Sequence, residues 1–184
     1  MKRALDIVIS LAALVLLSPI LLLAAFAVAL ESGRPILFGQ TRVGLGGREF
    51  RMFKFRSMVR NAESLGPQYT RDNDDRVTRV GRVLRRSSVD ELPQLLNVLA
   101  GDMSLVGPRP ALPSQRGLYA AEEWQARCSV RPGITGLAQA LLRSSGSLQE
   151  CTVLDLRYAR EASLALDLKI IARTVAMLLQ GHGN

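Results

Sequence analysis

The chain is poor in the residues that most enzymes use for catalysis. Its 184 residues include one histidine, His182 near the end, and two cysteines, Cys128 and Cys151. A single histidine argues against a Ser-His-Asp site, a zinc protease and a histidine phosphocarrier. Two distant cysteines are too few for a metal cluster, and we interpret them as reduced thiols, with a disulfide left open. Neither a P-loop nor a GxGxxG motif is present, so acid, base and nucleophile must come from carboxylates, lysine or tyrosine.

Aromatic residues are also scarce, at 5% of the chain, whereas Lys and Arg outnumber Asp and Glu by 24 to 16. The whole excess lies in residues 1–89, which hold 15 basic and 7 acidic residues. Such a basic segment suits an anionic lipid or a nucleic acid. Because few aromatics leave few platforms for stacking bases, we expect no nucleic-acid partner. A non-catalytic module that binds anionic lipid or nucleic acid is the alternative to an enzyme.

One long apolar run is present. Residues 7–30 are apolar or small and carry no charge, and a helix of that length spans a bilayer core. Ser18-Pro19 lies in the middle, where proline removes a hydrogen bond and kinks the helix. Lys2 and Arg3 precede the run and further basic residues follow it. Because cytoplasmic flanks attract cations, a re-entrant hairpin with both ends inside competes evenly with a kinked transmembrane helix.

The stretch from Thr78 to Pro110 combines cations, two carboxylates and a stiff Pro-Arg-Pro turn. Ser88-x-x-Glu91 fits a capping box, whereas Pro93 favours a helix that begins with Asp90 as its N-cap. Both alternatives place Asp90 and Glu91 at a helix N-terminus, where an ionised carboxylate or a phosphate is stabilised. Capping alone is the commonest use of such a pair. Four arginines precede it and favour phosphate chemistry: Arg79, Arg82, Arg85 and Arg86.

Short strands are predicted before this stretch. Ile36–Phe38 reads as extended, and Phe50–Arg56 alternates apolar and basic residues except at Met52, which predicts a half-buried strand with a basic outer face that includes Lys54. Residues 61–77 contain Asp72, Asp74 and Asp75. Their spacing lacks the glycine and distal glutamate of a calcium loop, so a surface loop that closes over substrate is preferred to a metal site.

Helices are predicted after Pro110. The first covers residues 114–127 and places Trp124 in the core, with the membrane interface as the less favoured alternative. At residues 130–139 a Pro-Gly turn and a short loop are expected to bring Arg131 near an anion. A last helix begins after the N-cap Ser163 and ends before Gly181. Packing in the core is the simpler expectation for it, and the bilayer surface is the alternative.

These motifs resemble those of the monotopic phosphoglycosyl transferases, a family of bacterial sugar transferases. The resemblance rests on RRSSVDELPQLLNVLAGDMSLVGPRP at residues 85–110, the QxRxG pattern at 40–44, KFRSM at 54–58 and RPGITGLAQ at 131–139. It extends from Lys2 to about Val175 and implies the small, minimal form. The chain departs from the family pattern at Ala140–Arg143. We therefore assign no role to this loop, and in particular no role in sugar selection.

The resemblance implies a mostly helical α+β fold. Residues 1–31 would be a re-entrant membrane helix, broken at Ser18-Pro19, and residues 32–184 a cytoplasmic catalytic domain with interfacial helices at the bacterial inner membrane. The implied reaction moves a phosphosugar from a UDP-sugar to polyprenol (undecaprenyl) phosphate and releases UMP, the first membrane step of surface glycan assembly. The sugar and the oligomeric state stay open, a homo-oligomer included.

The resemblance also implies roles for the site residues. Asp90 would attack the β-phosphorus and form a covalent phosphosugar. From the residues themselves, we expect the helix N-terminus and the nearby Arg85 and Arg86 to keep Asp90 ionised at neutral pH. Glu91 would orient a metal and its water or help to deprotonate the acceptor. Mg²⁺, bound by Asp90 and then Glu91, would neutralise the diphosphate. The candidate phosphate contacts are Lys54, Arg85, Arg109 and Arg131.

Overall fold

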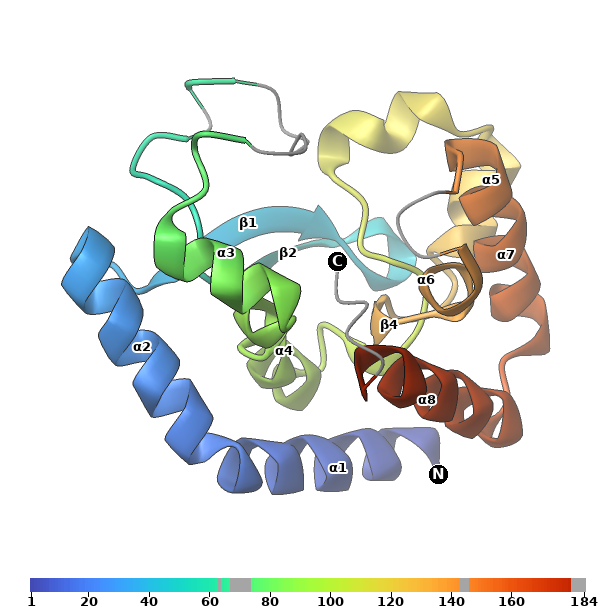
Figure 1. Ribbon diagram of the computed structural model, residues 1–184. Coiled ribbons are helices and arrows are strands. Elements are labelled where there is room, and N and C mark those ends of the chain that lie inside the picture. The colour runs from blue at the N-terminus through green and yellow to red at the C-terminus, as the bar shows by residue number, and fades with distance from the viewer. Residues whose placement is uncertain (63, 67–73, 143–145, 180–184) are drawn as a thin grey trace.

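The computed structural model describes residues 1–62, 64–66, 74–142 and 146–179. It is a mostly helical α+β structure with two small sheets, as expected. A bent pair of helices runs along two sides of a body that contains the strands and the other helices (Figure 1). The expectations about Asp72, Arg143, Gly181 and His182 lie outside the described residues.

The apolar run forms two helices, α1 (Lys2–Leu16) and α2 (Ser18–Ser32), which meet at Leu17 with a bend of 64°. Ser18 Oγ donates to the Val15 carbonyl over 2.8 Å, and Pro19 lies in the first turn of α2, where a helix needs no N–H donor. The expected broken helix is thus confirmed, and it is longer at both ends than residues 7–30. Among the described helices none is long and apolar enough to cross a membrane alone, whereas α1 and α2 together have the required length and composition.

The inner face of α1 is tied to the body by polar contacts. Asp6 accepts hydrogen bonds from Ser104 Oγ at 2.9 Å and from the Leu105 N–H at 3.2 Å. Lys2 Nζ lies 2.7 Å from Asp167 Oδ2. These contacts hold the N-terminal helix on the body, and the domain boundary between residues 31 and 32 stays a prediction.

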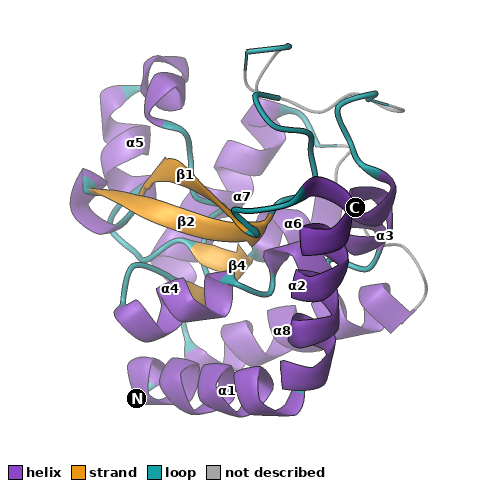
Figure 2. Cartoon of the chain, turned by 90° about the vertical axis from the view of Figure 1, so that its left-hand side faces the viewer, coloured by secondary structure: helices purple, strands orange, loops and turns teal. Residues whose placement is uncertain are grey.

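A β-hairpin crosses the middle of the body (Figure 2), with β1 (Leu37–Val43) antiparallel to β2 (Glu49–Phe55). A 3₁₀ turn, η1 (Leu45–Gly47), joins them, with both Gly46 and Gly47 at positive φ. The strand is as expected, and Arg51 is exposed on it, but Lys54 and Arg56 do not join a solvated outer face. Lys54 is largely buried, and Arg56 is 7% exposed and donates to the carbonyls of Ser32 and Gly33 at the end of α2. That part of the prediction is wrong because other elements cover the strand.

Helix α3 (Arg79–Arg86) packs on α2. Thr78 caps it, since its Oγ1 accepts from the Gly81 N–H at 2.9 Å. A Cβ on Gly81 would lie 2.0 Å from the Ser57 carbonyl oxygen, so only glycine allows α3 to approach so closely. The apolar side of α3 joins a core cluster with α2 and Phe55. A 3₁₀ turn, η2 (Val89–Glu91), and α4 (Gln94–Ala100) follow α3.

The predicted loop at residues 130–139 is instead a strand and a helix. β4 (Gly133–Thr135) pairs in parallel with β3 (Ser104–Val106), and α6 (Leu137–Leu142) follows. The loop prediction is wrong because parallel pairing depends on β3, which lies about 30 residues earlier. The helix predicted at 114–127 is also split, into η3 (Pro113–Leu118) and α5 (Ala121–Arg127).

Two long helices complete the body, α7 (Leu148–Glu161) and α8 (Leu164–Leu179). Ser163 caps α8 as predicted, because its Oγ accepts from the Leu166 N–H at 3.3 Å. One core cluster lies between β3, α6, α7 and α8 around Tyr158, and Trp124 lies in another, which confirms the core position. Cys128 and Cys151 are free thiols.

Candidate active site

The two acidic residues lie in η2, one turn before α4. Ser88 adopts a left-handed conformation at φ 55° and makes no capping hydrogen bond, and Pro93 occupies the N-cap position of α4. The predicted capping box and the Asp90 cap are therefore both wrong. Pro93 has no N–H, so the regular helix starts only after it. The pair is left in a tight turn between α3 and α4.

Glu91 pairs with Lys54 of β2. Lys54 Nζ lies 2.6 Å from Glu91 Oε1, and the two side chains are 19% and 16% exposed. Arg109 Nη2 lies 3.7 Å from the same carboxylate oxygen. Burial raises the pKa of Glu91, but Lys54 and Arg109 outweigh it, so the pKa is lowered overall. Burial lowers the pKa of Lys54, and Glu91 opposes this only in part.

Asp90 has a different environment from its neighbour. The residue is 7% exposed, and burial raises the pKa of its carboxyl to about 6 against the opposing charges of Lys54 and Arg85. The carboxylate is thus still mostly ionised at pH 7, but it is more basic than an ordinary aspartate. Arg86, expected to help hold it ionised, is exposed on α3. Buried carboxyls with perturbed pKa values beside a cleft are typical of functional sites.

Glu91 lines a small hollow together with three cations, Arg42, Lys54 and Arg109. Its other lining residues are Met52, Gln94, Pro110, Gly133 and Ile134. Burial and the nearby Arg109 lower the pKa of Arg42 to about 10. Charge-assisted hydrogen bonds from these three cations suit the phosphate oxygens of a substrate. Asp90 lies beside this hollow and is not part of its lining.

Arg109 is carried by a turn whose three carbonyls all accept hydrogen bonds. The Pro108 carbonyl accepts from the Gly133 N–H at 2.9 Å, and the Pro110 carbonyl accepts from Arg42 Nη1 at 2.9 Å. The Arg109 carbonyl accepts from Arg127 Nη2. Arg127 is itself buried, with its Nε 3.0 Å from Asp155 Oδ2. The Pro-Arg-Pro turn therefore presents the Arg109 side chain from a rigid backbone.

The distance between Lys54 and Glu91 depends on Asn97 of α4. Its side chain is 1% exposed, its Oδ1 accepts from the Phe53 N–H at 3.0 Å, and its Nδ2 donates to the Arg51 carbonyl at 2.8 Å. The amide thus pairs with the free edge of β2 as a neighbouring strand would. It holds the residue before Lys54 against the helix that follows Glu91.

The structure brings together four of the six predicted site residues around η2. Asp90 and Glu91 lie next to Lys54 and Arg109. Arg85 is not in this group, and its Nε donates to Ser57 Oγ at 2.9 Å. Arg131 lies elsewhere and donates to the Gly101 carbonyl at the end of α4. Sequence reasoning missed Arg42, Asn97 and the buried Arg127–Asp155 pair. Arg42 and Asn97 each had a signal, since Arg42 is the arginine of the QxRxG pattern and Asn97 lies in the motif at residues 85–110.

Two adjacent carboxylates fit a magnesium site completed by a substrate. Among the described residues no three His, Cys, Asp or Glu side chains gather in a group. Magnesium is commonly held by one or two carboxylates together with substrate phosphates, and Asp90 with Glu91 matches that donor set. Asp74, considered above as part of a metal site, instead lies 2.7 Å from Arg76.

Comparison with known proteins shows the family of this chain. The family model described as "Bacterial sugar transferase" matches residues 1–181. The "UDP-glucose:undecaprenyl-phosphate glucose-1-phosphate transferase" of Caulobacter vibrioides is 48% identical over 97% of this chain and 69% of its own length.

Two further relatives differ from each other in length. The "UDP-N-acetylgalactosamine-undecaprenyl-phosphate N-acetylgalactosaminephosphotransferase" of Aeromonas hydrophila is 43% identical over 99% of this chain, which spans only 44% of that protein. The "Exopolysaccharide production protein PSS" of Rhizobium leguminosarum is 43% identical over the whole chain and 98% of its own length. As its motifs indicated, the chain belongs to the bacterial sugar transferase family, and so to the phosphoglycosyl transferases.

Proposed function

We propose that this protein transfers a sugar 1-phosphate from a UDP-sugar to undecaprenyl phosphate and releases UMP. The observation that carries the proposal is the hollow in which Arg42, Lys54 and Arg109 surround Glu91, with Asp90 beside it. Three cations around a small hollow suit a diphosphate, because charge-assisted hydrogen bonds to phosphate oxygens are strong. The names of the relatives in Caulobacter vibrioides and Aeromonas hydrophila support the same pair of substrates.

The proposed reaction has two steps. In the first, a carboxylate oxygen of Asp90 attacks the β-phosphorus, the bond from that phosphorus to the UMP oxygen breaks, and UMP leaves. In the second, a phosphate oxygen of undecaprenyl phosphate attacks the same phosphorus, and the acyl phosphate bond breaks to return Asp90. The carboxyl with a pKa of about 6 suits this role, since it is ionised at pH 7 and a better nucleophile than an ordinary aspartate.

The other residues of the hollow stabilise charge. Arg42, Lys54 and Arg109 bind the diphosphate oxygens and the negative charge that develops on the leaving UMP. Glu91, adjacent to Asp90, would help to hold the metal or to deprotonate the acceptor. Magnesium, held by Asp90 and Glu91, supplies neutralisation of the diphosphate when bound.

The bent pair explains how a soluble nucleotide sugar and a lipid acceptor meet. We place α1 and α2 in the cytoplasmic leaflet of the bacterial inner membrane, with both ends on the cytoplasmic side. Single cysteines near positions 2 and 34, in a chain without Cys128 and Cys151, should both resist an impermeant thiol reagent applied to intact cells. Labelling of one end only would show a spanning helix.

The covalent step is tested by incubating the protein with a UDP-sugar and magnesium in the absence of the acceptor. We expect the mass of one phosphosugar on the peptide that contains Asp90, one equivalent of UMP, and neither product in excess chelator. Asp90→Asn serves as the matched control. If rapid quenching never traps this mass and UMP release requires both substrates together, the transfer is direct and Asp90 is not the nucleophile.

A further inference from the structure

An unusual stripe of arginines lies on the outer face of α3. Arg79, Arg82 and Arg86 follow the spacing i, i+3, i+7, which places them on one face of a helix. All three are exposed and flank Val83, which is 66% exposed. None of the three is in an ion pair with a residue that the structure describes. We call these three residues the α3 stripe.

The α3 stripe is anchored at the end of the bent pair. Glu31 of α2 accepts hydrogen bonds from the backbone N–H groups of Arg79 and Val80, each at 2.9 Å. Val80 and Leu84, on the inner side of α3, pack with α2 around Phe55. The stripe therefore lies where the chain leaves α2, and it points away from that packed side.

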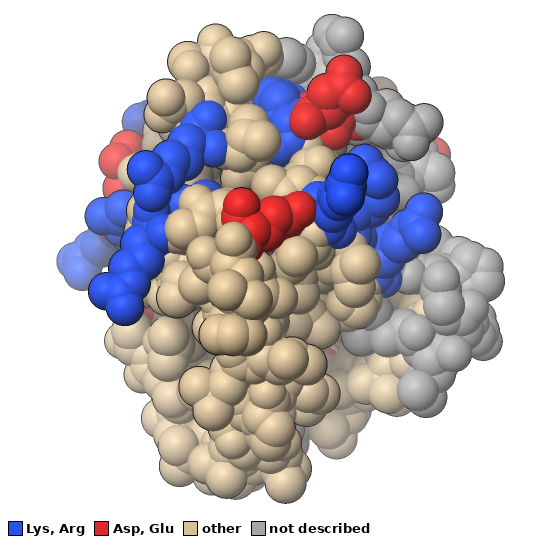
Figure 3. Space-filling view, turned by 60° about the vertical axis from the view of Figure 1, so that its left-hand side comes forward, with Lys and Arg blue, Asp and Glu red and all other residues tan. Residues whose placement is uncertain are grey.

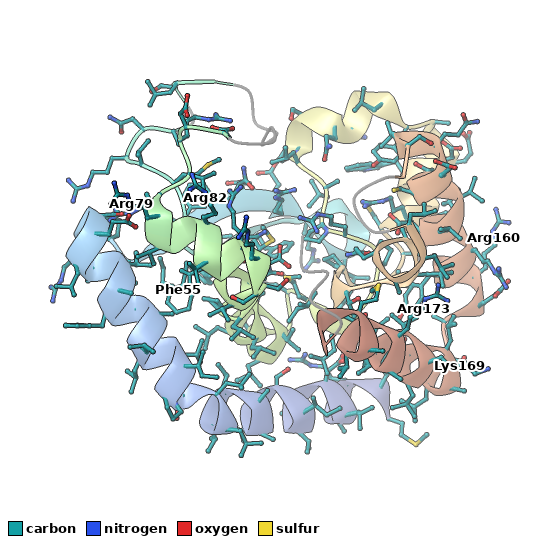
Figure 4. The ribbon with its side chains drawn as sticks, in the orientation of Figure 1. Phe55, Arg79, Arg82, Arg160, Lys169 and Arg173 are labelled. Atoms are coloured by element: carbon teal, nitrogen blue, oxygen red, sulfur yellow. The ribbon has the colours of Figure 1, made fainter. Side chains whose placement is uncertain are left out.

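A second cationic group lies at the other end of the bent pair. Lys169 and Arg173 are exposed and one turn apart on α8, near the exposed Leu168 and Val175. The ion pair between Lys2 and Asp167 joins α8 to the start of α1. Figure 4 shows Arg79 and Arg82 near the end of α2, and Lys169 and Arg173 on α8, the helix whose Asp167 pairs with Lys2 of α1. We call Lys169 and Arg173 the α8 pair.

Between the two groups the surface of the bent pair is apolar. No charged residue occurs from Ile7 to Leu30, and exposed fractions reach 77% at Leu16, 71% at Leu22 and 62% at Phe26. In Figure 3 the lower part of the molecule shows almost no charged side chain, and lysines and arginines gather above it. An apolar wedge with cations where each end emerges matches a leaflet of acyl chains under anionic headgroups.

We infer that the α3 stripe and the α8 pair bind anionic phospholipid headgroups, so that the bent pair enters an anionic leaflet in preference to a neutral one. This inference rests on the membrane insertion of α1 and α2 in the proposed function. A nucleic acid matches the charge, but it does not account for the apolar surface between the two groups. The outward side chain within the stripe is valine, which offers no stacking surface for a base.

The test measures flotation of the purified full chain with vesicles of phosphatidylcholine, alone or mixed with phosphatidylglycerol. A cation near an anionic surface contributes about fivefold to partition. Arg79→Gln/Arg82→Gln should therefore weaken binding to the anionic vesicles roughly 25-fold at low salt, and Lys169→Gln/Arg173→Gln by a similar factor. On neutral vesicles both variants should match the wild type. Added salt should shrink the difference, because it screens exposed charges.

Arg48→Gln/Arg116→Gln is the matched control. It removes two exposed arginines near η1 and in η3, which lie away from the bent pair in Figure 1. This variant should keep the wild-type preference for anionic vesicles. In the α3 variant, glutamine retains a high helix propensity, so neither Arg79→Gln nor Arg82→Gln should unfold α3.

Four results would overturn the inference. If the control loses as much binding as the α3 variant, the preference reflects net charge and not these sites. If wild type floats equally with both vesicle types, insertion stands and the headgroup sites are wrong. Binding of single-stranded RNA that Arg79→Gln/Arg82→Gln abolishes, with flotation unchanged, would make the stripe a nucleic-acid site. Failure to float with either vesicle would instead refute the insertion of α1 and α2, and this inference with it.

Discussion

The bent pair and the hollow both reverse the usual placement of apolar and charged side chains, but in opposite senses. The bent pair exposes Leu16, Leu22 and Phe26 and turns the buried Asp6 and Ser10 towards the body. The hollow instead withdraws Lys54 and Glu91 from water. Soluble proteins mostly do the opposite, since charged groups are rarely buried unless paired. Each reversal supports the contact proposed for that region, an apolar leaflet for the bent pair and an anionic substrate for the hollow.

The largest expected effect is at Asp90. Asp90→Asn should reduce UMP release by about 10⁴-fold or more, because the amide is not a nucleophile. The change should also stabilise the fold. Because the pKa lies at about 6 in the folded chain and the ordinary value is 3.8, the ionised form costs stability, and this cost grows as the pH rises between those values.

Denaturant unfolding at several pH values checks the second part of this prediction. At pH 8 Asp90→Asn should be more stable than wild type by about 3 kcal/mol at most, and the gain should shrink as the pH falls towards 3.8. Equal stability at every pH would mean that burial does not raise the pKa of Asp90. The site would then not differ from an ordinary solvated carboxylate at this residue.

The second prediction concerns the pair between β2 and η2. Lys54→Met should destabilise the chain by about 3 kcal/mol, because it leaves Glu91 buried beside a lost partner. Lys54→Met/Glu91→Leu should recover most of that stability without recovering activity. Denaturant unfolding and UMP release together separate the two outcomes. If the double variant is as unstable as the single one, packing and not charge explains the loss.

The third prediction contrasts two residues of α2. Leu23 is 69% exposed and Val28 is 1% exposed. Leu23→Gln should leave stability in detergent unchanged and weaken partition into vesicles roughly tenfold. Val28→Ala should do the reverse and cost about 2 kcal/mol of stability with little change in partition. If Leu23→Gln unfolds the chain, its exposed side is part of a protein core.

The smallest expected effect is on the pH profile. Turnover should fall about tenfold for each pH unit below about 6, as Asp90 becomes protonated. Arg85 opposes that protonation, so Arg85→Gln should move the acid limb of the profile to higher pH. Arg86→Gln is the control and should leave the limb in place. An unchanged limb in Arg85→Gln would show that Arg85 does not act on Asp90.

Local patterns predicted the elements whose contacts are local. The uncharged run with Pro19 indicated a broken helix, and the alternation at residues 50–56 indicated β2. Ser163 marked the start of α8. The loop at residues 130–139 was mispredicted because Gly133–Thr135 becomes a strand only by pairing with Ser104–Val106. The capping pattern at Ser88 failed for a local reason, since Pro93 delays the start of the regular helix to Gln94.

By itself, the sequence determined the bent pair, the family and the candidate acidic pair, because helix breaks and contiguous motifs are properties of neighbouring residues. Only the tertiary structure decided what those acids do. It set Lys54 2.6 Å from Glu91 across 37 residues of chain, brought Arg42 into the hollow and left Arg131 outside it. It also raised the pKa of Asp90, since burial depends on all the elements packed around a group and not on its neighbours in the chain.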